Sequence, residues 1–312
     1  MPHFAERIAG GLWGLLVGDA VGVPYEFHAP SELPPYAALD MLPPAGFRRA
    51  HAQVPPGTWS DDGAQALALL ASLLACGKLD LDDLGRRLVA WYDHGDMAVD
   101  RVVFDVGIQT AEAIRALKAG AVAHVAGPRH ERANGNGSLM RVLPLALWHR
   151  GSDSELVRDA QAQSLVTHGH LRAQVCCALY CLWARRLLYA APDAWADAVA
   201  TLRTIYGSTS PEYAELAEHI RPDDPPQGQG SGYVVDSLHS ARMVFQAHTY
   251  ADVVRGAIAL GHDTDTTACI AGGLAGVRDG LQAIPAAWMQ QLRGKALVEP
   301  LLEQLLRLAA QP

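Results

Sequence analysis

The chain has 312 residues, of which 50% are hydrophobic and 19% are charged, with a formal net charge of −8 at pH 7. This length and composition provide enough apolar side chains for a large core, and the negative charge argues against binding the phosphate backbone of nucleic acids. The five cysteines are odd in number and include no CxxC pair, which argues against a disulfide framework and predicts a reducing, cytoplasmic environment.

The first predicted helix covers residues 5–18. Its apolar run, Ile8 to Val17, follows Arg7 much as in a short signal peptide. The run contains glycines at three- and four-residue spacing, however, and it ends in Asp19 rather than in a cleavage site. We therefore expect a helix packed closely against a neighbour, with no signal sequence and no membrane association. The proline-rich stretch 28–57 that follows must be an irregular loop, which could form a wall of a site.

Hydrophobic spacing predicts helices through the rest of the chain. Apolar residues recur at three- and four-residue intervals, and no segment shows sustained strand alternation. The expected helices cover residues 61–76, 80–94, 152–166, 169–189, 234–246, 250–260, 266–280, 285–293 and 295–309, with two more beginning after Asp105 and at Leu139. We expect an all-α fold, a single domain over residues 1–312 built as an orthogonal helical bundle.

Carboxylates and hydroxyls gather where two of these helices are expected to begin. The clusters are Ser60, Asp61 and Asp62, and Asp263, Asp265 and Thr266. Neither contains Lys or Arg, so the carboxylates raise one another's pKa unless a cation is present, and an all-oxygen donor set favours hard cations. Two residues apart, Asp263 and Asp265 should lie on a loop if both are to face one cavity. Each cluster alone also fits ordinary helix N-capping, but two together suit a pair of metal ions in a central cleft.

Several other polar residues stand next to predicted helices. Asp105 is either a helix cap or a carboxylate facing a substrate. The turn Gly135–Ser138 offers backbone N–H groups to an anion, and Arg141 could pair with a phosphate or form a structural ion pair. Tyr233 follows a flexible, glycine-rich loop and begins a helix.

Five motifs give the chain a resemblance to the ADP-ribosylglycohydrolase family, which includes dinitrogenase reductase-activating glycohydrolases and ADP-ribosylarginine hydrolases. The motifs occur in family order and span nearly the whole chain: Gly18–Phe27, Trp59–Asp62, Gly135–Arg141, Thr167–His168 and His262–Thr267. The first cluster departs from the family pattern, because relatives usually show Thr-Asp-Asp-Thr where this chain has Ser60-Asp61-Asp62-Gly63.

The resemblance implies hydrolysis of an α-linked ADP-ribosyl group with two Mg²⁺ or Mn²⁺ ions. It implies that the metals are held by Ser60, Asp61, Asp62, Asp263, Asp265 and Thr266. It implies that ADP-ribose contacts Asn136, Gly137, Ser138, His168 and Tyr233, and that catalysis depends on Glu26, Asp61, Asp105 and Asp263. Either Glu26 or Asp105 could be the general base.

The implied substrate is an ADP-ribosylated protein, and the product is ADP-ribose. Arginine-linked ADP-ribose is the expected substrate, because Asp105-Val106-Gly107, Thr110 and the pair Thr167-His168 resemble the arginine-directed branch. The competing acceptors are O-linked, serine or acetyl. Two other readings remain: a phosphohydrolase using His262-Asp263 as a His-Asp pair, and a non-catalytic family member that keeps the fold for a structural purpose.

Overall fold

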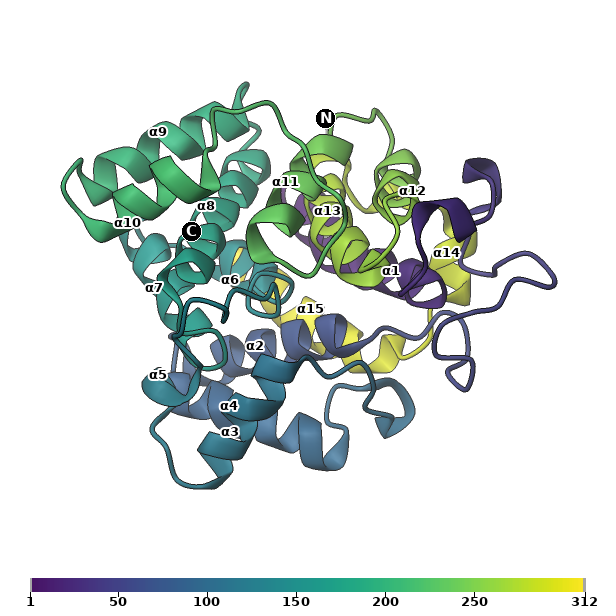
Figure 1. Ribbon diagram of the computed structural model, residues 1–312, viewed down its shortest axis with the longest axis horizontal. Coiled ribbons are helices and arrows are strands. Elements are labelled where there is room, and N and C mark those ends of the chain that lie inside the picture. Colours follow the sequence, from purple (N-terminus) through teal and green to yellow (C-terminus); the bar gives the residue numbers. More distant parts are fainter. Residues whose placement is uncertain (1, 311–312) are drawn as a thin grey trace.

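The computed structural model describes residues 2–310, and Figure 1 shows them as an assembly of helices. Within this range there is no β-strand, only an isolated bridge between Gly135 and Tyr233. The predicted all-α fold is therefore confirmed. The α-helices are α1 (Phe4–Gly22), α2 (Asp61–Cys76), α3 (Leu81–His94), α4 (Ile108–Lys118), α5 (Ala123–Ala126), α6 (Leu143–Trp148), α7 (Asp153–Leu165), α8 (Leu171–Leu188), α9 (Ala194–Tyr206), α10 (Pro211–Ala214), α11 (Val234–Val244), α12 (Tyr250–Ala259), α13 (Thr264–Asp279), α14 (Ala286–Gln291) and α15 (Lys295–Ala309).

Helices α1 and α13 form the central pair of the fold. Glycines on α1 recur every fourth residue, and each faces α13 so closely that a Cβ would lie 2.2 Å from the Gly276 oxygen at Gly10 and 2.1 Å from the Ala268 oxygen at Gly18. The paired residue numbers fall on α13 as they rise on α1, so the two helices are antiparallel. The close packing predicted from the glycine spacing is confirmed. Helix α1 is apolar and long enough to cross a membrane, but its apolar stretch is entirely buried inside the protein.

The other helices surround this pair. In Figure 1, α2, α3, α4 and α5 lie on one side of it, α7, α8, α9 and α10 lie on another, and α11 and α12 lie beside α13. Helix α14 contacts α1. The buried apolar residues form one cluster that includes side chains from α1, α2, α8 and α13. Four of the five cysteines are fully buried within it and all five are free thiols, as expected for small core residues.

The helices differ from the expected ones in three places, two of them boundaries and one a helix that was not expected. The helix expected from Leu139 begins at Leu143, because Pro144 occupies its first turn, the position in a helix that best tolerates proline. Helix α13 begins at Thr264 rather than Thr266, so Asp265 lies in its first turn and not on a loop. Helix α9 was not predicted, although Asp193 caps it and four of its apolar residues are buried on one face: Ala194, Ala198, Val199 and Leu202.

Candidate active site

The two acidic clusters, distant in sequence, meet where α2 and α13 begin. The Thr266 hydroxyl on α13 donates to Asp62 Oδ2 on α2 at 3.3 Å, and the Ser60 hydroxyl donates to the same oxygen at 3.1 Å. Asp263 and Asp265 can both turn toward this point because Asp263 is the residue before α13 and has non-helical dihedrals, φ −97° and ψ 69°. The helical spacing that would separate their side chains therefore does not apply.

Helix α1 holds both clusters in place. The Asp19 carboxylate accepts hydrogen bonds from the backbone N–H of Ser60 at 2.9 Å and of Gly63 at 2.8 Å, so it caps α2 from a neighbouring helix. At the end of α1, a Cβ on Gly22 would lie 2.4 Å from Asp265 Cα. The Gly22 carbonyl also accepts a hydrogen bond from the Thr264 hydroxyl at 2.8 Å. The close packing of α1 on α13 thus fixes where Asp265 can lie.

The chemistry of these groups fits a cation. Burial and mutual repulsion raise the pKa values of Asp61, Asp62 and Asp265 well above the usual range. Asp62 Oδ1 and Asp265 Oδ2 are buried and have no hydrogen-bond partner, although buried carboxylate oxygens normally have one. In addition, one carboxylate oxygen from each of Glu26, Asp263 and Asp265 lies within 4.8 Å of the others. Clustered, unpartnered carboxylate oxygens are the ligands that hard divalent cations prefer.

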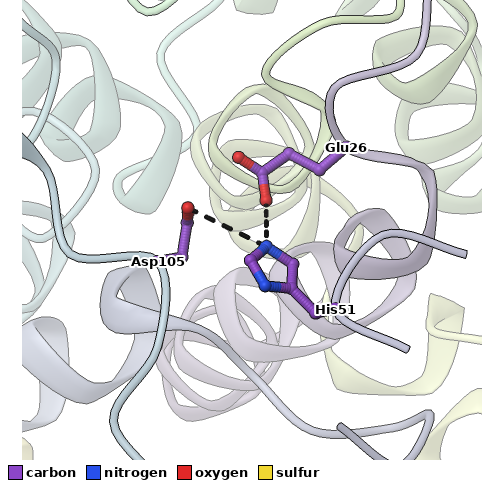
Figure 2. Close-up of side chains that lie close together, drawn as sticks. All are labelled: Glu26, His51 and Asp105. Atoms are coloured by element: carbon purple, nitrogen blue, oxygen red, sulfur yellow. Dashed lines mark hydrogen bonds and ion pairs between the residues drawn. The ribbon is translucent and has the colours of Figure 1, made fainter. Parts of the chain in front are cut away.

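Glu26 and Asp105 face the same histidine, His51 (Figure 2). His51 Nε2 lies 2.7 Å from Glu26 Oε2 and 3.9 Å from Asp105 Oδ1. Burial, with repulsion from Asp105 and Asp263, raises the pKa of Glu26 to about 11, and the pKa of Asp105 rises to about 6, again mainly through burial. Asp105 is not the cap of α4, because Gly107 occupies that position. His51 belongs to the proline-rich loop, which does reach the site, but nothing in its local sequence distinguished it from the other histidines.

Four of the residues around the carboxylates have left-handed backbone conformations that are unusual outside glycine. Their φ angles are 62° at Phe27, 47° at His51, 56° at Asp105 and 60° at His262. Phe27 and His262 are joined by a hydrogen bond of 2.7 Å between the Phe27 N–H and the His262 carbonyl. Such conformations persist only where the surrounding structure enforces them, and they are frequent at functional sites.

The glycine turn lies against His168. A Cβ on Gly137 would lie 2.7 Å from His168 Cε1, so this position needs glycine for close approach. The Asn136 amide donates to Asp263 Oδ2 at 2.8 Å and to the Ser237 hydroxyl at 2.9 Å, which links the turn to α13 and α11. The backbone N–H groups of Gly137 and Ser138 make no hydrogen bond to the described part of the chain.

All of these groups border one cavity of about 1250 Å³. Its lining includes Glu26, Asp61, Asp105, Asn136, Gly137, His168, Tyr233, Asp263 and Thr266. Ser60, Asp62 and Asp265 lie behind this surface and are buried, as is Ser138. The sequence-predicted site residues therefore gather at one place, and a cavity of this size can take a nucleotide-sized ligand.

Cationic and aromatic side chains complete the cavity lining. Arg132, His130 and Arg172 are among its residues, and Arg172 donates to the Tyr233 hydroxyl at 3.1 Å. Tyr233 is 40% exposed and is the cap residue directly before α11, which begins at Val234 as expected. The glycine-rich segment before it was expected to be flexible, but its end packs on α11: the Ser231 N–H donates to Asp236 at 2.7 Å.

Arg141 and His262 do not have the roles that the sequence suggested for them. Arg141 is fully buried and forms no ion pair within the described residues, so neither the phosphate contact nor the structural ion pair applies. His262 is exposed and belongs to neither group of side chains close enough to share a metal. The arrangement therefore gives no support to a phosphohydrolase in which His262 binds the metal.

Comparison with known proteins identifies relatives of the whole chain. The family model described as ADP-ribosylglycohydrolase matches residues 1–312. An ADP-ribosylarginine hydrolase Tri1 from Pseudomonas putida is 31% identical over 98% of this chain and 79% of its own length. An ADP-ribosyl-[dinitrogen reductase] glycohydrolase from Rhodospirillum rubrum is 29% identical over 93% of this chain and 92% of its own. A solved structure, an ADP-ribosylglycohydrolase-related protein complex, superposes with a TM-score of 0.78 at 28% identity over 99% of both chains.

Proposed function

The chain belongs to the ADP-ribosylglycohydrolase family and is a glycosidic-bond hydrolase, and we propose that it uses divalent cations to remove ADP-ribose from ADP-ribosylated arginine on proteins. The observation that carries this proposal is the convergence of two acidic helix starts on one cavity, where Asp62 Oδ1 and Asp265 Oδ2 are buried without partners. A buried anionic oxygen in this state costs free energy until a cation binds to it.

Six residues would hold two Mg²⁺ or Mn²⁺ ions: Ser60, Asp61, Asp62, Asp263, Asp265 and Thr266. Bound there, divalent cations supply Lewis-acid stabilisation of negative charge on oxygen. The chain itself orients these ligands. Asn136 fixes one oxygen of Asp263, and the Thr266 N–H donates to Asp265 Oδ1 at 2.9 Å, which leaves Asp265 Oδ2 free for an ion.

Glu26 and Asp105 are the candidates for general acid–base catalysis. Asp105 keeps the lower pKa of the two, about 6, so near neutral pH it is the better acceptor for a proton from an attacking water. In the ion-free protein, burial and repulsion from Asp105 and Asp263 raise the pKa of Glu26 further than that of Asp105. Glu26 is held by His51, through a short hydrogen bond whose donor depends on the His51 tautomer. We therefore propose Asp105 as the general base, with Glu26 placed to orient the water or the substrate.

Charge and shape support ADP-ribose as the ligand and arginine as the acceptor. The cavity lining includes Arg132 and Arg172, which can pair with a diphosphate, and the exposed rings of Phe27 and Tyr233, on which a base can stack. The lining also includes Glu112, in addition to Glu26, Asp61, Asp105 and Asp263. The negative charge of these carboxylates attracts a guanidinium. The relative from P. putida is named as an ADP-ribosylarginine hydrolase, which supports arginine as the acceptor.

The test is a side-by-side assay on arginine-linked and serine-linked ADP-ribosyl peptides at equal concentration, with Mg²⁺, with Mn²⁺, and with a chelator. We expect ADP-ribose to be released faster from arginine, and release to stop when the chelator removes the metal. Faster release from serine would overturn the arginine assignment while retaining the metal site. Unchanged rates in chelator would reject the metal assignment.

A further inference from the structure

Arg141 is a buried guanidinium with no carboxylate close enough to form an ion pair in the described chain. The four hydrogen bonds of its guanidinium all go to neutral oxygens. Nε donates to Gln163 Oε1 at 3.0 Å, Nη2 to the Gln163 carbonyl at 2.9 Å, and Nη1 to both Gln65 Oε1 at 3.0 Å and the Thr167 hydroxyl at 2.7 Å. Burying an unpaired charge is costly, so this arrangement calls for an explanation in the residues that Arg141 contacts.

A guanidinium has five N–H donors and no acceptor, so it fixes the direction of any hydrogen-bond chain that starts from it. Thr167 Oγ1 must accept from Arg141. The hydroxyl has one hydrogen, and its other polar neighbour is His168 Nδ1, at 2.8 Å. An Nδ1–H ring would leave this hydrogen without an acceptor among the described residues, so pairing it favours an Nδ1 that accepts.

The proton on a neutral His168 ring then lies on Nε2. Burial, with repulsion from Arg141, lowers the pKa of His168 to about 3, so the ring is neutral at physiological pH. Nε2 makes no hydrogen bond to the described residues, and His168 lines the cavity. The ring presents an N–H donor to a ligand, which selects an acceptor such as a phosphate or hydroxyl oxygen.

The same reasoning applies to Gln65, the second acceptor of Arg141 Nη1. Gln65 Oε1 must face the guanidinium, which turns the Gln65 amide nitrogen toward Asp61 Oδ2, where it donates at 2.9 Å. A donor at this oxygen fixes the rotation of the carboxylate. Asp61 also lines the cavity.

We propose that Arg141 is a positioning residue that sets hydrogen-bond polarity at two points of the cavity lining, making His168 an Nε2–H donor through Thr167 and holding Asp61 as an oriented acceptor through Gln65. The proton position on His168 is a property of the free protein. Its use in contacting ADP-ribose, and the use of Asp61 in holding a cation, rest on the proposed function.

The test separates the two branches with one variant in each. Thr167→Val removes the hydroxyl at nearly constant volume, and Thr167→Ser restores it as the matched control. Gln65→Met removes the amide but leaves Thr167 in place. Arg141→Lys keeps the charge with fewer donors. The measurements are ¹⁵N shifts of the His168 ring in the free protein, calorimetric titration with ADP-ribose, and Mn²⁺ affinity by electron paramagnetic resonance.

We expect Nε2–H in the wild type and in Thr167→Ser, and a mixture of tautomers with about tenfold weaker ADP-ribose binding in Thr167→Val, the loss of one oriented hydrogen bond. Gln65→Met should keep the tautomer and bind Mn²⁺ roughly ten- to a hundredfold more weakly, as when other outer partners of metal ligands are removed. Arg141→Lys should show both changes, and if it does not fold, the Thr167 and Gln65 variants carry the test.

An Nδ1–H ring in the wild type would overturn the proposal. Retention of the wild-type tautomer in Thr167→Val would also overturn it. So would equal weakening of ADP-ribose and Mn²⁺ binding in both Thr167→Val and Gln65→Met, because a merely structural role produces that pattern. Absence of any ADP-ribose binding by a wild type with the Nε2–H ring would instead reject the proposed function and leave the proton assignment standing.

Discussion

Replacing Gly18 by alanine would place a Cβ 2.1 Å from the Ala268 carbonyl oxygen, about 1.3 Å closer than the 3.4 Å at which ordinary contacts begin. Both groups belong to helix backbones, so no change of rotamer relieves the clash and α1 must move away from α13. Overpacking costs about 1–3 kcal/mol and at times more, and the helix propensity of alanine returns about 1 kcal/mol. Because backbone meets backbone, we expect the upper end of this range, a net loss of about 2 kcal/mol.

Gly85 on α3 provides the matched control, since a Cβ there would meet Leu117 Cδ2 at an ordinary 3.4 Å. Gly85→Ala should gain up to about 1 kcal/mol from helix propensity alone. The two variants should therefore differ by about 3 kcal/mol in urea unfolding followed by circular dichroism, and Gly18→Ala should also bind Mn²⁺ more weakly because Asp19 moves with α1. Equal midpoints for the two variants would refute the argument that backbone contact requires glycine in α1.

Three further predictions concern the site. Asp263→Asn and Asp265→Asn should each abolish turnover and reduce bound Mn²⁺ while circular dichroism stays helical; near wild-type rates with added Mn²⁺ would reject the two-metal assignment. Tyr233→Ala should weaken ADP-ribose binding roughly ten- to hundredfold through lost stacking of about 1–3 kcal/mol, with Mn²⁺ affinity unchanged; calorimetry that detects no difference would assign the ring to packing on Arg172 alone. Burial raises the pKa of Asp19 to about 7 and that of Asp105 to about 6, so the folded state holds protons that the unfolded chain releases near pH 4, and the ion-free protein should lose stability as pH rises from about 4 to 7. The difference in melting temperature between samples with Mg²⁺ and with chelator should therefore widen over this range, and a constant difference would contradict it.

The sequence predicted the parts of the fold that depend on local chemistry. Ser60 followed by Asp61 and Asp62 marks a helix start because a hydroxyl and two carboxylates satisfy free N–H groups there, and α2 does begin at Asp61. Glycines on α1 spaced by three and four residues predicted a close neighbour, because such spacing keeps them on one face. They did not identify α13 as the neighbour, since a glycine face carries no information about its partner.

The parts of the site that depend on long-range contacts were not predictable. His51 lies in a proline-rich loop and is brought to Glu26 by backbone contacts such as that of the Ala50 N–H with the Pro24 carbonyl. Arg141 was considered for a phosphate or an ion pair because both are common partners of arginine. Its actual partners come from α2, α7 and the turn after α7, and only the assembled fold brings them together.

The glycine face and the acidic helix starts, which the sequence presents as separate features, act together. The N-terminus of a helix carries a partial positive charge that stabilises nearby anions, and α2 and α13 both direct this end at the carboxylates. Asp19 of α1 caps α2, and the glycines let α1 approach α13 closely, which brings the two helix starts together. Burial and mutual repulsion nevertheless raise the pKa values of Asp62 and Asp265 well above their usual range. The fold thus brings these carboxylates together at a cost that a bound cation would offset, and the same close packing would set the distance between the ions' ligands.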